Sequence, residues 1–389
     1  MLNQETVFRI LEEHGVTFYT GVPDSHLNGF CNYALAHYPE RNVIAANEGN
    51  AVGIAAGHYI AGGGIPLVYM QNSGMGNTVN PLVSLADEAV YAIPMILLIG
   101  WRGEPGTGDH PQHIRQGEIT PGLLEVMDIS YTILRDDEEH FAKAVDEAVS
   151  CCRDLRRPYA FIAPKGVMAA ADKPNNMDDT YPMSREQAIE VILDHMPADT
   201  VYSATTGRAT RELFFLRERR GETKAHDFLN VGSMGHASSV ALGIALEKPE
   251  RPVVVLDGDC AAIMHLGALT MPSVVPAPNL LHVVLNNGAH ESVGGQPSAG
   301  HRVDFTSVAG ACGYETCGKA AETEEELIEQ IETLTKRMRF GAEAQAGGAD
   351  GQARPGFIDC RVHKGLSRKL PPIVFDHREA IDKLIEDLS

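Results

Sequence analysis

Short apolar runs alternate with helical patterns along almost the whole chain of 389 residues. In the first half, the predicted strands are 17–20, 43–46, 66–70, 94–99, 131–134 and 159–163. In the second half, they are 200–203, 227–231, 252–256, 280–285, 314–317 and 356–362. Strands separated by helices are typical of parallel sheets, because a parallel connection must cross over the sheet. The pattern therefore predicts an α/β fold of mainly parallel sheets flanked by helices.

One polar stretch interrupts this rhythm. Residues 169–182 contain two prolines and no periodic apolar positions, which is typical of a linker. We therefore expect two related α/β domains, at 1–168 and 183–389. A further stretch, 342–354, is rich in Ala, Gly and Gln and is predicted to be an exposed insertion.

The formal net charge of −20 argues against general nucleic-acid or anionic-membrane binding, because both need basic surface. A pocket for an anionic ligand would need positive charge of its own. The seven cysteines are odd in number and show no paired spacing typical of zinc, which favours reduced thiols in a cytoplasmic protein. Residues 1–15 predict an acidic amphipathic helix rather than a signal peptide, and no apolar run reaches the length of about 18 residues that spans a membrane.

Polar residues follow two predicted strands of the second half. Asp259 comes just after the apolar run that ends at Leu256, and Asn286 and Asn287 follow the next strand. The roughly 25 residues between Cys260 and Asn286 suit one crossover helix between neighbouring parallel strands. Ligands of such sheets bind beyond the carboxyl ends of the strands. A carboxylate and an amide oxygen there would form part of a Mg²⁺ shell that phosphate oxygens complete, so we expect a magnesium-bound diphosphate.

This arrangement of Gly-Asp and Asn-Asn resembles the cofactor signature of thiamine diphosphate enzymes. The resemblance implies that the side chains of Asp259 and Asn287 and the backbone carbonyl of Ala289 bind the metal, and that Gly258 and Cys260 lie at the cofactor. The alternative is an acidic turn and an Asn-Gly loop. The family usually has glycine where this chain has Cys260. A negative φ there would tolerate the cysteine, whereas a positive φ would strain the turn by roughly 1 kcal/mol and weaken cofactor binding.

The segment GSMGHA at 232–237 is similar to a second family segment. By that resemblance, Met234 is the bulky apolar residue beneath the thiazolium ring, and the small residues Gly232 and Ser233 allow close approach of the backbone to the cofactor. The alternative is a helix start with a buried methionine.

In the first half, Glu48 follows a predicted strand and opens a helix rich in Ala and Gly. It resembles the family's activating glutamate, which binds N1′ of the aminopyrimidine and promotes loss of the thiazolium C2 proton. The alternative is an acid at a helix N-terminus, stabilised by the helix dipole. The segment GMGNTV at 74–79 partly mimics a dinucleotide fingerprint, but Val79 replaces the third glycine. We expect a tight strand–helix turn instead, with Gly74 near the cofactor's pyrimidine.

The resemblance becomes closer over nearly the whole chain. The segments that carry it are 21–27, 46–59, 67–87, 93–121, 205–214, 230–246 and 286–297. Together they resemble the phosphonopyruvate decarboxylases, and the sulfopyruvate decarboxylases are similar. The resemblance implies two thiamine diphosphate-binding-type domains, the pyrimidine-binding one at 1–168 and the diphosphate-binding one at 183–389. It also implies thiamine diphosphate and Mg²⁺ as cofactors, decarboxylation of 3-phosphonopyruvate to phosphonoacetaldehyde in phosphonate biosynthesis, and a homodimer or higher oligomer whose sites are shared between chains.

Decarboxylation needs proton carriers within hydrogen-bond reach of the reacting carbon atoms. The candidates are Asp24 and His26 after the first strand, and His110 and His113 after the fourth. His110 departs from the family, whose segment here is usually DEPQH. The alternatives are that Asp24 caps a helix together with Ser25 and that His26 is a packed helix residue.

The phosphonate group needs cations or helix N-terminal amides. The candidate cations near the motifs are Arg102, Arg115, Arg208, Arg368 and Lys369. The segment past the metal loop is expected to form a lid over the substrate through His290, Glu291 and Gln296.

Three other functions compete with phosphonopyruvate decarboxylation. Sulfopyruvate is a similar small 2-oxo acid with a terminal anion. A non-catalytic cofactor-binding subunit would explain the departures at Cys260 and His110, but Glu48, Asp259 and Asn287 are all retained. A nicotinamide-dependent dehydrogenase would need a full fingerprint, which the chain lacks.

Overall fold

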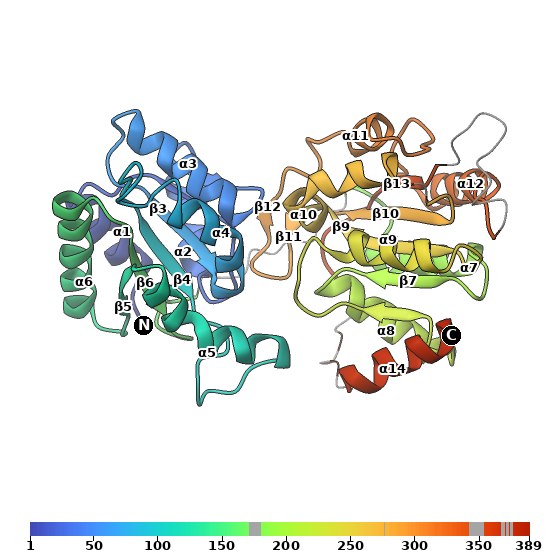
Figure 1. The fold of residues 1–389 in the computed structure, drawn as a ribbon, viewed down its shortest axis with the longest axis horizontal. Coiled ribbons are helices and arrows are strands. Elements are labelled where there is room, and N and C mark those ends of the chain that lie inside the picture. The colour runs from blue at the N-terminus through green and yellow to red at the C-terminus, as the bar shows by residue number, and fades with distance from the viewer. Residues whose placement is uncertain (171–179, 276, 342–353, 367–369, 371–372, 374–375) are drawn as a thin grey trace. The chain divides into compact units, whose positions relative to one another are not determined.

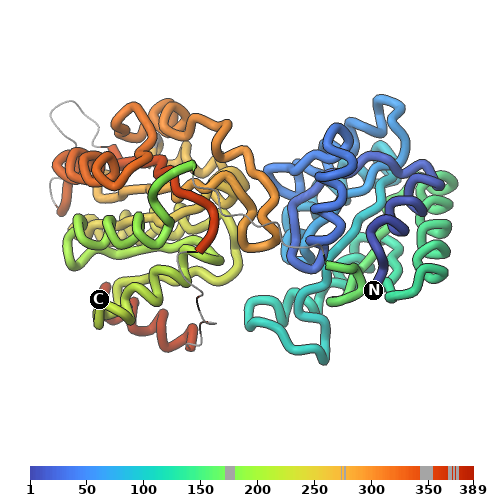
Figure 2. The backbone as a smooth tube through the Cα atoms, turned by 180° about the vertical axis from the view of Figure 1, so that it is seen from behind, coloured from blue at the N-terminus to red at the C-terminus, as the bar shows by residue number. Residues whose placement is uncertain are grey.

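A computed structural model describes residues 1–170, 180–275, 277–341, 354–366, 370, 373 and 376–389 (Figure 1). The chain forms two compact units. Unit one comprises Met1–Pro174 with His290–Gln296, and unit two comprises Asn175–Ala289 with Pro297–Ser389. Figure 2 traces the backbone from the N-terminus in unit one to the C-terminus in unit two. Most of the predicted linker 169–182 and of the predicted insertion 342–354 lies outside the described residues.

Unit one is built on a parallel sheet of six strands in the order β2-β1-β3-β4-β6-β5. Its strands are β1 (Tyr19–Gly21), β2 (Asn42–Ile44), β3 (Leu67–Gln71), β4 (Ile96–Gly100), β5 (Ser130–Ile133) and β6 (Tyr159–Ala163). Its helices are α1 (Gln4–Glu13), α2 (Asn28–His37), α3 (Glu48–Ile60), α4 (Met75–Val83), α5 (Pro111–Val126) and α6 (Glu138–Ser150), with a short 3₁₀ helix η1 (Asn72–Gly74) and a π-helical turn η2 (Cys151–Leu155).

Both faces of this sheet are covered by helices. Successive side chains of a strand point to opposite faces, and in β3 Leu67 and Tyr69 join a core with α1, α2 and α6. Val68 and Met70 join a second core with α3, α4 and α5. The central strands are therefore apolar on both faces, as the continuous apolar runs predicted.

Unit two contains a parallel sheet of five strands in the order β13-β10-β9-β7-β8. Its strands are β7 (Val201–Ala204), β8 (Asp227–Leu229), β9 (Val253–Gly258), β10 (Leu280–Asn286) and β13 (Gly356–Arg361). Its helices are α7 (Arg185–His195), α8 (Arg208–Arg220), α9 (Ala237–Glu247), α10 (Asp259–Met264), α11 (Phe305–Ala311), α12 (Glu324–Thr335) and α14 (His377–Leu388), with a 3₁₀ segment η3 (Leu266–Ser273). Helices α7, α8 and α12 share one core with the sheet, and α9 and α14 pack into another.

Three details differ from the prediction. Residues 314–317 form no strand and make only an isolated bridge, from Glu315 to Gly356. The apolar character of that run serves packing instead, because the ring of Tyr314 is buried against Phe357. The crossover from β9 to β10 is not one helix but the short α10 followed by η3, in which Pro272 cannot continue an α-helical hydrogen-bond ladder. A two-stranded ribbon of β11 (Ala289–His290) and β12 (Gln296–Pro297) was not predicted.

Across the described ranges, no helix combines the length and the apolar character that crossing a bilayer requires.

Candidate active site

Glu48 is the first residue of α3, after the turn that follows β2. Asn47 caps the helix by accepting a hydrogen bond from the backbone N–H of Asn50. The Glu48 side chain does not extend into solvent, since the residue is only 5% exposed, and its Oε2 accepts a hydrogen bond from Nδ2 of Asn77 at 2.7 Å. Burial raises the pKa of the Glu48 carboxyl group, although the bond from Asn77 opposes this effect. A buried carboxyl group with a raised pKa holds its proton more readily than an exposed one, which suits proton exchange with a ligand.

Gly74 lies against this carboxyl group. It ends η1, and a Cβ atom at this position would overlap with the Glu48 carboxylate. The turn between β3 and α4 is η1, which ends at Gly74, and residues 75–79 of the segment already belong to α4. The segment supplies Glu48 with both the space at Gly74 and the amide of Asn77.

Asp24 is fully buried beyond the carboxyl end of β1. Its Oδ1 accepts a hydrogen bond from Nε2 of Gln71 at 2.6 Å, and its Oδ2 accepts one from the backbone N–H of His26 at 2.9 Å. A Cβ atom on Gly100, at the end of β4, would overlap with Oδ2. The alternative reading of Asp24 as the cap of α2 is wrong, because Leu27 holds that position without a side-chain cap.

The predicted histidines of unit one differ in their surroundings. His26 and His113 are partly buried, and the Nδ1 atom of each has no hydrogen-bond partner among the described residues. Burial, with the positive charge of Arg102 adding to it, lowers the pKa of His113 to about 4, and burial also lowers the pKa of His26. Both imidazoles are therefore neutral near pH 7. His110 is exposed before the first residue of α5, and its ring centroid lies 6.4 Å from that of His113.

In unit two, the loop before α9 has an unusual backbone. Gly232, Ser233 and Gly235 adopt positive φ values of 77°, 42° and 86°. Such values strain a residue with a side chain, and strain of this kind is concentrated at functional sites. The backbone N–H of Gly232 donates a hydrogen bond to Oγ1 of Thr206 at 3.0 Å, which ties the loop to the end of β7. Met234 is partly buried and precedes α9, so it is neither a helix residue nor a fully buried core residue.

The predicted metal ligands follow two neighbouring strands. As expected, β9 and β10 are parallel neighbours, and Gly258 pairs with Leu285. Asp259 is only 3% exposed, and burial raises its pKa to about 6. Within the described part of the chain, no ion pair joins its carboxylate to a cationic side chain. Oδ1 of Asn287 accepts a hydrogen bond from the backbone N–H of Ala289 at 3.1 Å, and both residues are buried.

These residues fit a divalent cation. Carboxylate, amide and carbonyl oxygens are the hard ligands that Mg²⁺ prefers, and a buried carboxylate without a cationic partner is stabilised by a bound cation. When bound to diphosphate, the ion would complete its shell with phosphate oxygens.

Cys260 does not strain the turn. It lies inside α10 and does not have a positive φ, so the alternative of a strained backbone does not apply. Burial, with the charge of Asp259 adding to it, raises the pKa of the thiol well above its usual value. The thiol is therefore protonated, and its Sγ lies 3.7 Å from Oδ2 of Asp259 as a weak donor.

A short loop contacts the predicted ligand Asp259, and sequence reasoning missed it. The hydroxyl of Ser298 donates a hydrogen bond to Oδ2 of Asp259, and the backbone N–H of Gly300 donates one to Oγ of Ser298 at 2.9 Å. Asn286 holds this loop, because its Nδ2 donates to the carbonyl of Gly300 at 2.9 Å and to Oδ1 of Asp359 at 3.0 Å. The signal available in the sequence was the position of Asn286 beside Asn287 at the end of a strand.

The candidate phosphonate-binding cations have different surroundings. Arg115 is exposed and pairs with Glu118, Arg208 is the first residue of α8, and Arg368 and Lys369 lie outside the described residues. Arg102 is largely buried after β4 and lines a hollow of about 60 Å³, described further below.

The predicted lid residues contribute differently. Burial lowers the pKa of His290 to about 4, and Nε2 of the buried Gln296 donates a hydrogen bond to Oδ1 of Asn32 at 2.7 Å. Their role as a lid stays a prediction.

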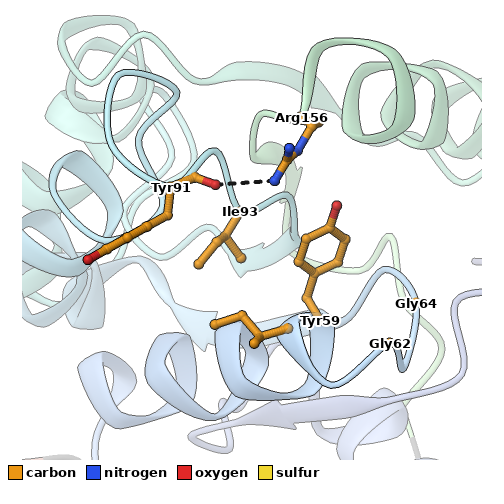
Figure 3. A pocket seen from close by; sticks show the side chains of 7 residues that line it. Tyr59, Gly62, Gly64, Tyr91, Ile93 and Arg156 are labelled. Atoms are coloured by element: carbon orange, nitrogen blue, oxygen red, sulfur yellow. Dashed lines mark hydrogen bonds between the residues drawn. The ribbon is translucent and has the colours of Figure 1, made fainter.

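A larger hollow of unit one, of about 740 Å³, contains none of the predicted site residues (Figure 3). It lies at the C-terminal end of α3, where Tyr59 and Ile60 line it, roughly 16 Å along the helix from Glu48. Its one cation, Arg156, donates hydrogen bonds to the backbone carbonyls of Tyr91 and Ala92. The guanidinium group is committed to these carbonyls, and the other side chains that line the hollow, those of Tyr59, Ile60, Tyr91 and Ile93, include no carboxyl or imidazole group.

Comparison with known proteins agrees with this geometry. The N-terminal TPP binding domain of thiamine pyrophosphate enzymes matches residues 2–121, and the C-terminal TPP binding domain matches residues 205–341. The first match contains Glu48 and Gly74, and the second contains Met234, Asp259 and Asn287. Fold and site thus define the class: an enzyme that binds thiamine diphosphate.

Curated relatives narrow the class. The phosphonopyruvate decarboxylase of Streptomyces viridochromogenes is 38% identical over 365 residues, which cover 88% of each chain. That of Streptomyces hygroscopicus is 37% identical over 77% of this chain and 76% of the relative. The sulfopyruvate decarboxylase of Methanosarcina acetivorans is 29% identical over 86% of this chain and 88% of the relative. The chain belongs to the phosphonopyruvate decarboxylase family of thiamine diphosphate-dependent decarboxylases, and this membership excludes the dehydrogenase alternative.

Proposed function

We propose that this protein decarboxylates 3-phosphonopyruvate to phosphonoacetaldehyde and carbon dioxide, with thiamine diphosphate and Mg²⁺ bound. One observation carries the choice of substrate: the identity to phosphonopyruvate decarboxylases is 37–38%, against 29% for the sulfopyruvate decarboxylase that matches a similar share of the chain. The product would enter phosphonate biosynthesis.

Asp259, Asn287 and the carbonyl of Ala289 would hold the magnesium ion of the cofactor. The strained loop at Gly232, Ser233 and Met234 would support the thiazolium ring. When bound, the cofactor supplies the electron sink for the carbon–carbon bond that breaks. Support for this assignment comes from the buried carboxylate of Asp259, which has no cationic partner among the described residues, and from the positive φ values of the loop.

Glu48 would hold a proton at N1′ of the aminopyrimidine. The raised pKa of this carboxyl group favours the form that carries the proton, and Gly74 leaves space beside it. Each turnover also takes up one proton at carbon after carbon dioxide leaves. Asp24, His26 and His113 are the candidates to relay it. Because the two imidazoles are neutral, each would accept a proton at one ring nitrogen and release one from the other, rather than act as a stored acid.

The family implies a homodimer or larger homo-oligomer, with Glu48 and Asp259 of one site supplied by different chains. We therefore propose that each active site of this protein is formed by two chains.

Release of carbon dioxide from phosphonopyruvate and from sulfopyruvate, with and without thiamine diphosphate and Mg²⁺, tests the proposed function. We expect cofactor-dependent turnover with a higher kcat/KM for phosphonopyruvate. Turnover that does not need the cofactor, or none with either substrate, would contradict it. A higher kcat/KM for sulfopyruvate would make the protein a sulfopyruvate decarboxylase, and cofactor binding without turnover would indicate a non-catalytic subunit.

A further inference from the structure

Two cations meet at the carboxyl edge of the unit-one sheet. Strands β4 and β6 are parallel neighbours, and their last residues, Gly100 and Ala163, pair with each other. Arg102 and Lys165 each come two residues later, so the strand register brings them to the same part of the edge. Both line the hollow of about 60 Å³, which His26 and Asp109 also line. The share of liquid volume that one water occupies is about 30 Å³, so this space suits a small group rather than a whole cofactor.

Arg102 is held in place by hydrogen bonds that do not use all of its N–H donors. Its Nε and Nη2 atoms donate to the two carboxylate oxygens of Asp109, each at 2.7 Å, while Nη1 lies 3.2 Å from the hydroxyl of Ser25. Asp109 also accepts bonds from the backbone N–H groups of Gly103 and His110, which closes the loop 102–109. The Asp109 carboxylate balances the charge of Arg102. It also holds the guanidinium group in one orientation, in which the remaining N–H groups can still donate to a ligand.

Lys165 leaves this hollow with a net positive charge. The described residues include no hydrogen-bond or ion-pair partner for its ammonium group. His26 adds a neutral ring whose Nδ1 is buried without a partner among those residues. Positive φ at Gly103 and Gly108 turns the loop around the space. Gly103 packs closely against the backbone carbonyl of His113, whereas a Cβ atom on Gly108 would meet nothing within 4 Å. Two cations, one carboxylate and neutral donors suit an anion that accepts several hydrogen bonds.

We propose that this hollow binds the phosphonate group of the substrate and that Lys165 is the residue that selects for it. This inference rests on the proposed function. A phosphonate, like a phosphate monoester, can lose a second proton and so carries between one and two negative charges near neutral pH, whereas a sulfonate carries one. The second cation, Lys165, therefore contributes more to binding of phosphonopyruvate than of sulfopyruvate. The place of the hollow fits, since His26 lines it and lies next to the buried Asp24 at the same sheet edge.

The test compares Lys165→Met, which keeps most of the aliphatic stem, with Lys165→Arg and with Lys143→Met. Lys143 is an exposed lysine of α6 in the same unit and serves as the matched control. In the holoenzyme, we expect Lys165→Met to raise the KM for phosphonopyruvate by roughly tenfold to hundredfold, as loss of a hydrogen bond to a charged group does. The kcat should change by less than about threefold, the inhibition constant of methylphosphonate should rise in parallel with KM, and Lys165→Arg should restore both.

Equal KM and inhibition constants in Lys165→Met and the wild type would overturn the subsite. If wild-type protein releases no carbon dioxide from phosphonopyruvate, the proposed function fails separately. Calorimetry with methylphosphonate then decides on the subsite. Binding to the wild type and Lys143→Met, but not to Lys165→Met, supports it, while equal binding to all three, or none, refutes it.

Discussion

At the scale of single residues, Glu48 combines burial with a contact to the neutral amide of Asn77, whereas the equally buried Glu186 in the first turn of α7 pairs with Arg219. We expect Glu48→Gln to lower kcat by roughly 100-fold or more, as removal of a proton-transferring group does, while the protein folds normally and binds thiamine diphosphate. Glu138, an exposed acid in the first turn of α6, provides the control. If Glu48→Gln keeps full activity, as Glu138→Gln should, Glu48 is only a helix-terminal acid.

His113 provides a prediction about pH. Its folded-state pKa of about 4 lies below the usual 6.5, so between these values the unfolded chain binds a proton that the folded chain does not. This difference destabilises the fold as the pH falls from 6.5 toward 4. We expect His113→Gln to lose less stability than the wild type between pH 7.5 and 4.5, by about 1–2 kcal/mol after allowance for solvent screening.

Urea midpoints of the cofactor-free proteins at the two pH values measure this effect. The exposed His37, changed to Gln, is the control. Parallel pH dependence in His113→Gln and the wild type would show that the buried imidazole is not neutral in the folded state.

Several residues of the candidate site could be proposed from the sequence because their signal is local. Asp259 and Asn287 directly follow apolar strands, and Glu48 opens a helix after another. Ser298 could not be found in this way, since it meets Asp259 across 39 residues of chain. The position of Lys165 beside Arg102 depends on the pairing of β4 with β6, and no local sequence pattern specifies that pairing.

At the scale of elements, only part of the strand order could be predicted from the sequence. Neighbouring β9 and β10 were expected from the short crossover, and the structure confirms them. The run 314–317 was misread because burial of Tyr314 against Phe357 gives the same apolar pattern as a strand. Apolar periodicity reports burial, and burial alone does not specify hydrogen bonding to a neighbouring strand.

The loop over Asp259 leads to a prediction at this scale. An added Cβ on Gly300 would lie 2.5 Å from Oδ2 of Asp259 and 2.5 Å from Oδ1 of Asn286. We expect Gly300→Ala to displace the loop and to weaken Mg²⁺-dependent binding of thiamine diphosphate by about tenfold. The melting temperature of the cofactor-free protein should change little. Titration of the cofactor at fixed Mg²⁺ measures the affinity.

Gly310 provides the matched control, because a Cβ there meets only Oγ1 of Thr316 at an ordinary 4.0 Å. Gly310→Ala should bind the cofactor like the wild type. Unchanged affinity in Gly300→Ala would mean that the loop does not support the metal ligands.

At the scale of the whole molecule, the two halves of the proposed chemistry lie in separate units, with Glu48 in unit one and Asp259 in unit two. If sites are shared between chains of a symmetric dimer, a mixture of Glu48→Gln and Asp259→Ala chains regains activity. Random pairing leaves about a quarter of the sites intact, because one of the two sites in each mixed dimer carries both native residues. Refolding the two inactive variants together and measuring carbon dioxide release tests this. No regained activity would place both residues of a site in one chain.

The glycine at the end of β4 limits which amino-acid substitutions this enzyme tolerates. Gly100 borders the Asp24 carboxylate so closely that even a methyl group would overlap with it. In a library of random variants selected for activity, this position should therefore admit no other amino acid, although glycine has no side chain with which to act on a substrate. The loss of variants at this position would suggest that Gly100 is a catalytic residue. Its actual cause would be the space that the neighbouring Asp24 carboxylate occupies.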